Sequence, residues 1–178
     1  PDFQPSDLMH LARDYHFETL SQELRLSGSH GQGRWLLGAY ADREDHDLDY
    51  QQKLPMGLSR TQAGLGGNTA ALFGQWLQPL SGAWSLTLGG RYEYARAWID
   101  PAGNRNQSDS WQHFTPKVAV QYALSDDAQA YVSYSQGMRA GGFNAFASSA
   151  GNPAYDPEQV RSLEVGLKGL TADQRLRY

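Results

Sequence analysis

Strict alternation of apolar and polar side chains is the feature that most restricts what this chain can fold into. The segment WSLTLGGRYEY, residues 84–94, shows it most clearly. One set of alternate positions holds Trp, Leu, Leu, Gly, Tyr and Tyr, and the other holds Ser, Thr, Gly, Arg and Glu. Because successive side chains of a β-strand point to opposite faces, this pattern predicts a strand with one apolar and one polar face.

Similar segments recur along the chain, and together they predict an all-β protein. Clean alternation returns in residues 18–28, 116–124, 128–135 and 161–169. Residues 34–42 and 69–77 are strand-like but apolar on both faces, so their orientation stays open. A last segment, RLRY, starts at Arg175 and stops at the end of the chain. We therefore expect about eight antiparallel strand segments, the last of them incomplete.

Composition narrows the class of protein further. The 178 residues carry a formal net charge of −4 and no cysteine. This balance argues against nucleic acid as a partner, and it leaves no disulfide or thiolate metal site. No apolar run approaches the roughly 20 residues of a membrane-spanning helix, but alternating strands cross membranes without such a run. The chain begins without Met or a signal-peptide pattern, so we expect a mature or cut segment.

The connections between the segments alternate between short and long. The short ones are SGSHGQG, QPLSGA, LSDDA and LTADQ, and the long ones are predicted at residues 42–68, 95–113 and 137–158. Outer-membrane barrels have short periplasmic turns and long extracellular loops. This pattern predicts an antiparallel transmembrane β-barrel segment, with Asp126 in the periplasm and Asn104 and Ser148 outside the cell.

Aromatic residues are predicted to gather at both ends of the strands. Trp35, Trp76 and Trp84 lie beside short turns, whereas Tyr92, Tyr94 and Tyr134 lie toward the long connections. Tyr and Trp favour membrane–water interfaces because one part of the ring system is apolar and another forms hydrogen bonds. Two aromatic belts are typical of a membrane barrel; the alternative is a soluble sheet with an aromatic core.

Several stretches together resemble the barrel of TonB-dependent outer-membrane receptors, and within that family the ferric-siderophore receptors. The most specific are FTPKVAVQYALSDDAQAYVSYSQGMRAGGFN (114–144) and YDPEQVRSLEVGLKG (155–169), supported by SQELRL, RWLLGAYADRED and ALFGQW. The resemblance implies a 22-stranded barrel filled by a plug domain, of which residues 1–178 form a part without the plug. A rival small, closed barrel would place a long outer loop after its first strand, but residues 27–33 are a short connection.

The resemblance also implies a function and partners. A receptor of this family lies in the outer membrane of a Gram-negative bacterium, binds a ferric-siderophore-type chelate and imports it with energy delivered by the TonB complex through the plug. Outer-membrane lipid is the other expected partner. The alternative is a non-transporting outer-membrane barrel, either structural or adhesive, or a membrane-embedded hydrolase. No catalytic arrangement, metal site or cofactor is expected.

Ligand-binding candidates follow from their chemistry and from their position near the long connections. Arg139 and the aromatic residues Trp98, Trp111 and Tyr155 suit an anionic or planar chelate through charge and stacking. For Arg139, a purely structural place at the barrel rim is the alternative. The glycine pair at residues 141–142 is predicted to turn the backbone through positive φ.

Other acidic residues have simpler interpretations. Asp45, Asp47 and Asp49 open like a calcium loop, but Tyr50 and Met56 stand where such a loop needs Gly and Glu. A solvated acidic surface is the expectation. The carboxylates predicted to face the barrel interior have basic neighbours, and the expected pairs are Glu23 with Arg25, Glu93 with Arg91 and Glu164 with Lys168.

Overall fold

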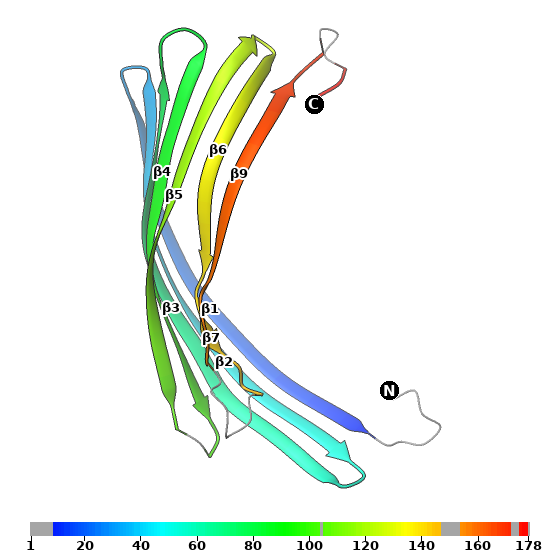
Figure 1. Cartoon of the computed structure of the whole chain (residues 1–178). Coiled ribbons are helices and arrows are strands. Elements are labelled where there is room, and N and C mark those ends of the chain that lie inside the picture. Colours follow the sequence, from blue (N-terminus) through cyan, green and yellow to red (C-terminus); the bar gives the residue numbers. More distant parts are fainter. Residues whose placement is uncertain (1–8, 104, 147–153, 172–174, 178) are drawn as a thin grey trace.

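The described residues of the computed structural model, 9–103, 105–146, 154–171 and 175–177, are built from β-strands. Figure 1 shows them as one tall, curved wall. The strands are β1 (His10–His30), β2 (Gly33–Leu54), β3 (Gly57–Pro79), β4 (Trp84–Pro101), β5 (Gln107–Ser125), β6 (Ala128–Arg139), β7 (Gly142–Phe143), β8 (Ala154–Tyr155) and β9 (Glu158–Gly169). The described residues contain no helix that is long and apolar enough to cross a membrane.

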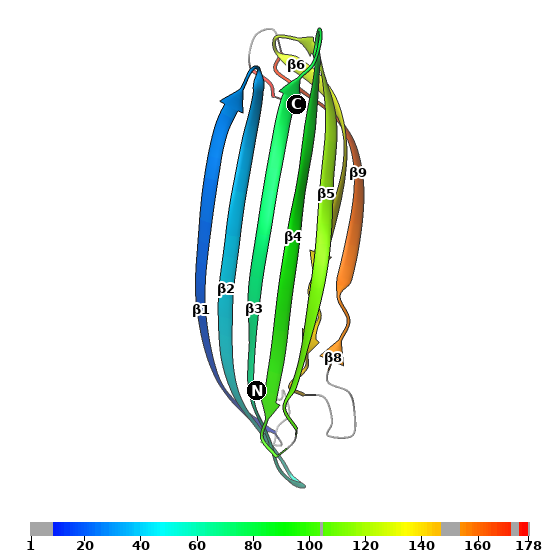
Figure 2. The ribbon, with the colours of Figure 1, turned by 90° about the vertical axis from the view of Figure 1, so that its left-hand side faces the viewer.

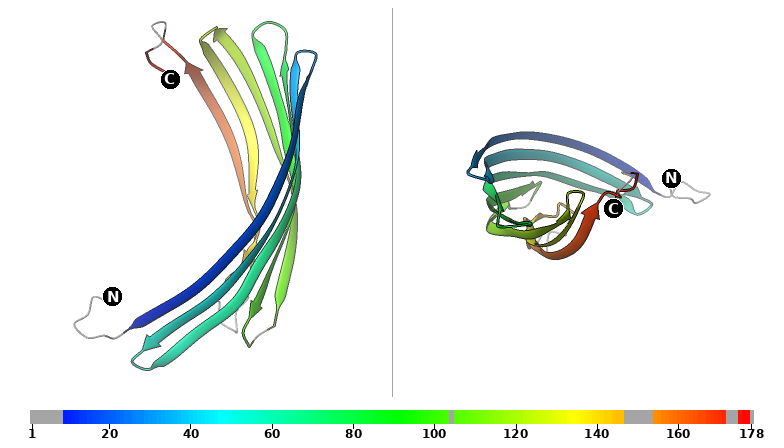
Figure 3. Two further views of the ribbon diagram at one scale, coloured as in Figure 1. Left: turned by 180° about the vertical axis from the view of Figure 1, so that it is seen from behind. Right: turned by 90° about the horizontal axis from the view of Figure 1, so that it is seen from above.

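The wall is a seven-stranded antiparallel sheet in the order β1-β2-β3-β4-β5-β6-β9. Figure 2 shows these strands side by side, and the view from above in Figure 3 shows them bent into an open arc. Strands β1 and β9 are the two edges, so the sheet is only partly closed. The predicted eighth segment adds no strand within the described residues, where a single bridge joins Leu170 to Arg177.

The pairing register confirms the alternation and orients the two strands that the sequence left open. Cross-strand partners share a face, and the register joins Leu37 to Leu26, Leu72 to Tyr92 and Leu88 to Val118. We call this face, which carries most of the exposed large apolar side chains, the outer face. The opposite, inner face lies on the concave side and carries small or polar buried residues such as Ala71, Thr87 and Ala119.

Aromatic residues of the outer face gather at the short-turn end, as predicted. Trp35 pairs with Trp76 across β2 and β3, and the rings of Trp84 and Tyr122 lie 4.7 Å apart across β4 and β5. The turns at 31–32, 80–83 and 126–127 all lie at this end of the wall, at the top of Figure 1. Gly31 and Gly82 adopt positive φ there, at 59° and 70°, which tight turns require.

At the other end, two of the three predicted long connections are wrong. Strands β2 and β3 continue through residues 42–68 and meet in a two-residue turn at 55–56, and β4 and β5 continue through most of 95–113. Tyr92 and Tyr94 consequently lie within β4, not at its end. Position Asn104 and residues 147–153, which include Ser148, lie outside the described residues. The connection from β6 to β9 is long, as predicted, and holds the small β7–β8 sheet.

The extended ends differ from the rest of the wall in their chemistry. On the outer face of β2–β4, a row of cross-strand neighbours that holds Arg43, Asn68 and Arg96 interrupts the apolar residues. From Arg43, strand β2 continues to Leu54, about 36 Å of contour at the usual rise per residue. A transmembrane strand needs only about 9–11 residues. Residues 43–54 of β2 are mostly polar, so neither face of this extension continues the apolar surface.

Candidate functional site

The inner face of the extended strands carries a cluster of aromatic and basic side chains. On β1, Arg13 lies over the ring of Tyr15, 5.0 Å from its centroid. The Tyr15 hydroxyl is hydrogen-bonded to Nδ1 of His46 on β2, and the ring of Phe17 lies 4.5 Å from the His46 ring. On the other side of His46, Nε2 lies 3.5 Å from a carboxylate oxygen of Glu44. The cluster continues the alternation of β1 upstream of the segment that the sequence analysis recognised.

The segment that follows β6 folds inward over this cluster. After Arg139, the last residue of β6, the chain forms β7, which pairs with β8 and packs on β4. Phe146 then contacts the ring of Tyr50 on β2 edge-on, with centroids 5.1 Å apart. We call residues 140–146 the strap. It ties the end of β6 to the concave side of the wall.

The two glycines of the strap are needed for close approach, not for positive φ as predicted. Both are buried, and neither has φ in the positive region. A Cβ at Gly141 would lie 2.5 Å from the carbonyl oxygen of Tyr155 and 2.7 Å from the ring of Trp111. A Cβ at Gly142 would collide with the Tyr155 ring, 2.7 Å away at Cζ. Only glycine lets the strap lie this near to β8 and β5.

The strap divides the concave side into two adjoining hollows, one of ≈ 470 Å³ and one of ≈ 380 Å³. Six residues border both of them: His46, Leu65, Arg139, Ala140, Phe143 and Tyr155. The larger hollow adds Arg13, Tyr15 and Phe146, and the smaller adds Trp111. A site with aromatic rings and two guanidinium groups can stack on a planar ligand and neutralise a negative one.

Three of the four predicted site residues come together here. Arg139 and Tyr155 border both hollows, and Trp111 lies on the inner face of β5, under Gly141. Trp98 also borders the smaller hollow, but the register places its side chain on the outer face, where the ring covers Gly66. Tyr15, His46 and Phe143 also border the hollows, and none of the three was predicted from the sequence. The period-two spacing of Arg13, Tyr15 and Phe17 could have indicated that these side chains share one face of a strand.

The charges around the hollows leave both guanidinium groups open to a ligand. Among the described residues, neither Arg13 nor Arg139 forms an ion pair with a carboxylate. Acidic residues do border the larger hollow, Asp156 and Glu158 on the β8–β9 side. The site therefore combines positive charge for an anionic group with acidic residues on one side that limit which anions fit.

The predicted interior pairs lie on the inner face nearer the short turns, and two of the three are present. Arg25 pairs with Glu23, and Nε of Arg91 donates to Glu93 over 2.8 Å. The Arg91 guanidinium also lies over the ring of Tyr40, at 5.3 Å.

The third expected pair is replaced by a different arrangement on β6 and β9. Glu164 accepts a hydrogen bond from Tyr131, and the Lys168 ammonium lies over the Tyr131 ring at 4.6 Å. In this part of the inner wall, Arg25 and Arg91 thus have carboxylate partners, and Lys168 has an aromatic one.

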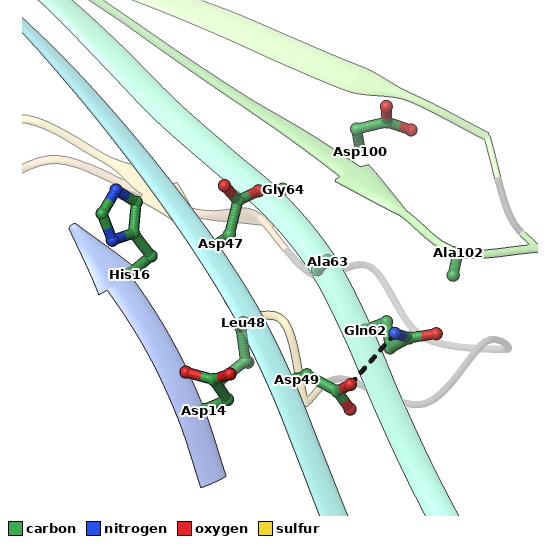
Figure 4. Close-up of a pocket in the computed structure, with 10 residues that line it drawn as sticks. All are labelled: Asp14, His16, Asp47, Leu48, Asp49, Gln62, Ala63, Gly64, Asp100 and Ala102. Carbon is green, nitrogen blue, oxygen red and sulfur yellow. Dashed lines mark hydrogen bonds between the residues drawn. The ribbon is translucent and has the colours of Figure 1, made fainter. Parts of the chain in front are cut away.

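The aspartates that resemble a calcium loop lie on the outer face instead. Figure 4 shows Asp47 and Asp49 with Asp14, His16 and Asp100 around a hollow of ≈ 470 Å³ in the extended region. Asp49 pairs with Arg60, whose Nε lies 2.9 Å from Oδ1, and it accepts from Gln62 over 3.2 Å. The hydrogen bonds from Arg60 hold the pKa of Asp49 below its usual range. Within the described part of the chain, no group of His, Asp or Glu side chains is arranged to hold a metal ion.

Known proteins resemble this chain in sequence and in structure. A family model described as "TonB dependent receptor-like, beta-barrel" matches residues 2–178. The ferric yersiniabactin uptake receptor FyuA from Yersinia pestis has a similar structure, with a TM-score of 0.85 and 18% identity over 94% of this chain and 28% of its own. The siderophore receptor PiuA from Acinetobacter baumannii gives a TM-score of 0.72 and 14% identity, over 93% of this chain and 31% of its own. The alcaligin receptor FauA from Bordetella pertussis gives a TM-score of 0.65 and 18% identity, over 96% of this chain and 29% of its own. The chain thus spans less than a third of each of these structures.

Proposed function

Because this chain belongs to the TonB-dependent receptor β-barrel family, whose structural neighbours are transport receptors and not enzymes, we propose that it forms part of an outer-membrane receptor for a ferric-siderophore-type chelate. In this proposal, the receptor imports its ligand with energy delivered by TonB through a plug domain. The site residues are Arg139, Tyr155 and Trp111, and Trp98 has no place in the site because its ring lies on the outer face.

The single observation that supports a ligand site is the pair of hollows beside the strap. They lie on the concave side, at the end opposite to the short turns, where an outer-membrane barrel faces the outside of the cell. Arg139 and Tyr155 border both hollows, so one bound molecule can contact the guanidinium and the ring together. Negative, aromatic-bearing chelates match both groups. The same residues offer little to a neutral oligosaccharide beyond stacking.

Binding by the intact receptor tests this site. With a panel of ferric chelates, quenching of tryptophan fluorescence should report a ligand near Trp111. A hydrogen bond to a charged group contributes about 1.5–3 kcal/mol, so Arg139→Gln should raise the Kd of the best chelate about tenfold or more. Arg161→Gln is the matched control, because Arg161 lies on the neighbouring strand β9 but on the outer face. Equal affinities for Arg139→Gln and wild type would remove Arg139 from the site.

Transport is tested separately in cells. Deletion of the receptor gene should abolish uptake of the radioactive iron complex, and so should dissipation of the proton-motive force that TonB uses. Wild-type uptake by the deletion strain of every chelate on the panel would refute the proposed iron function. Uptake that persists without the proton-motive force would refute the proposed coupling to TonB.

A further inference from the structure

A hollow of ≈ 600 Å³ lies on the outer face, in the middle of the apolar surface. Its floor is a pair of cross-strand partners, Gly74 on β3 and Gly90 on β4. Apolar side chains form its rim: Trp35, Leu37, Trp76, Leu88 and Phe114. Two of them lean over the floor, since a Cβ at Gly74 would lie 2.9 Å from Leu37 and a Cβ at Gly90 would lie 2.7 Å from Phe114. Neither the proposed ligand site nor the turns account for this hollow.

The chemistry of the hollow selects hydrocarbon over peptide. The backbone groups of its glycine floor belong to the β3–β4 ladder, so they are not available to a bound backbone. A peptide segment in the hydrocarbon region must satisfy its own N–H and C=O groups, and an irregular one cannot do so here. The end of an acyl chain needs no hydrogen-bond partner and gains from burial of apolar area.

A cationic row lies on the same face at a distance that matches one membrane leaflet. Arg43, Asn68 and Arg96 are successive cross-strand neighbours. Six residues separate Gly90 from Arg96, or about 20 Å along the strand, which at a tilt of about 40° is about 15 Å of depth. Half of a hydrocarbon core about 30 Å thick is the same length. A lipid whose head group lies at the row would thus place the end of its chain at the glycine floor.

Within the row, Arg96 is the group available to an anion. Arg43 is engaged by Asp45, with Nε 2.7 Å from Oδ2. The exposed Arg96 side chain makes a single polar contact among the described residues, to the Ser108 hydroxyl at 3.4 Å. Arginine binds phosphate in a bidentate manner, and basic residues at a membrane surface attract anionic head groups.

We infer that the outer face of β2–β5 binds one anionic, phosphate-bearing lipid, with its phosphate on Arg96 and the end of an acyl chain in the Gly74–Gly90 hollow. This inference rests on the proposed function only in requiring that the outer face lies in a bilayer.

Photocrosslinking in the intact receptor tests the inference. The receptor is reconstituted in phosphatidylcholine vesicles that contain a minor fraction of phosphatidylglycerol with a diazirine at the end of an acyl chain. Crosslinks mapped by mass spectrometry should concentrate on Leu88 and Phe114, and be sparse on Val165, which is equally lipid-facing but distant on β9. When the diazirine is on phosphatidylcholine instead, the crosslinking yield at the hollow should be about fivefold lower. One basic residue near a membrane surface contributes about 1 kcal/mol to the binding of an anionic head group, which corresponds to this factor.

Two substitutions separate the head group from the chain. Arg96→Gln should abolish the preference for phosphatidylglycerol, whereas Arg161→Gln on the outer face of β9 should leave it unchanged. Gly90→Leu should fill the hollow and reduce its crosslinking to the level of Val165. Should Gly90→Leu fail to fold, the effect of Arg96→Gln on the phosphatidylglycerol preference still tests the lipid site.

The outcomes distinguish failure of this inference from failure of the proposed location. Crosslinks spread evenly over the outer face, or a preference for phosphatidylglycerol that survives Arg96→Gln, would refute the lipid site and leave the membrane face intact. Absence of crosslinks from the entire outer face would refute the membrane location itself, and the lipid site with it.

Discussion

A pair of adjacent residues on β6 provides the sharpest test of the two faces. Val132 lies on the outer face between Val120 of β5 and Val165 of β9, and it is 47% exposed. The next residue, Ser133, lies on the inner face, and its partner across to β9 is Glu164. Arginine at position 132 would point toward lipid among valines, whereas arginine at position 133 would meet a polar wall and a carboxylate.

With the outer face in a bilayer, as proposed, the strand geometry gives the depth of Val132. Val132 is five residues beyond Asp127, the last residue of the short turn, or about 17 Å along the strand. At a tilt of about 40° this is a depth of about 13 Å, which is the middle of an apolar band about 25 Å tall. An arginine side chain cannot reach either interface from there without deforming the bilayer. The expected cost of Val132→Arg is about 3 kcal/mol, or about 150-fold in the folding equilibrium.

Urea titration of the intact receptor in lipid vesicles measures this cost, with the folded fraction read from heat-dependent mobility on gels. Val132→Arg should lower the free energy of unfolding by the amount above, and Ser133→Arg should lower it by about 1 kcal/mol or less. Similar losses for the two variants, or a larger loss for Ser133→Arg, would show that the outer face does not face lipid.

Three further predictions test other parts of the structure. In intact cells, a membrane-impermeant thiol reagent should label Met56→Cys at the far turn, and should label Asp126→Cys only after the outer membrane is permeabilised; the reverse pattern would invert the topology. Gly141→Ala should detach the strap and weaken chelate binding while leaving the wall folded, as measured by fluorescence titration and gel mobility, and unchanged binding would show that the strap has no role in the site. Because Arg60 lowers the pKa of Asp49 in the folded state, their pair should contribute stability above the usual Asp pKa and lose it as pH falls through the lowered value. Arg60→Gln should return the Asp49 pKa, followed by carboxyl NMR, toward its usual range, and no change would contradict the assigned pairing.

The part of the wall nearest the short turns could be predicted from the sequence because an apolar outer face and a polar inner face impose a period of two. Leu88 and Val118 were assigned to one face from the pattern alone, and the register confirms it. Strands β2 and β3 lack this signal, since Leu36 and Leu77 face inward while Leu37 and Leu72 face outward. Only the pairing with neighbouring strands resolves their orientation.

The extended strand ends and the site could be predicted only in part, for a related reason. Residues 42–54 are polar on both faces, so their sequence resembles a loop although ladder hydrogen bonds make it a strand. Arg139 and Tyr155 were predicted because a guanidinium and an aromatic ring lie beside a long connection. His46 and Trp98 depend on which way a strand faces and on how the strap folds inward, and neither follows from local spacing.

The extension of β1–β5 beyond the apolar band has a consequence for recognition. Ordering one residue of a flexible loop costs about 1–2 kcal/mol of backbone entropy, which a ligand that organises the loop must offset from its own binding energy. Here Arg13, Tyr15 and His46 lie on paired strands. Folding therefore already orders their backbone, and ligand binding loses no further backbone entropy at these residues. New specificities could then evolve by exchanging single side chains at fixed positions on a rigid frame, without redesign of the backbone that presents them.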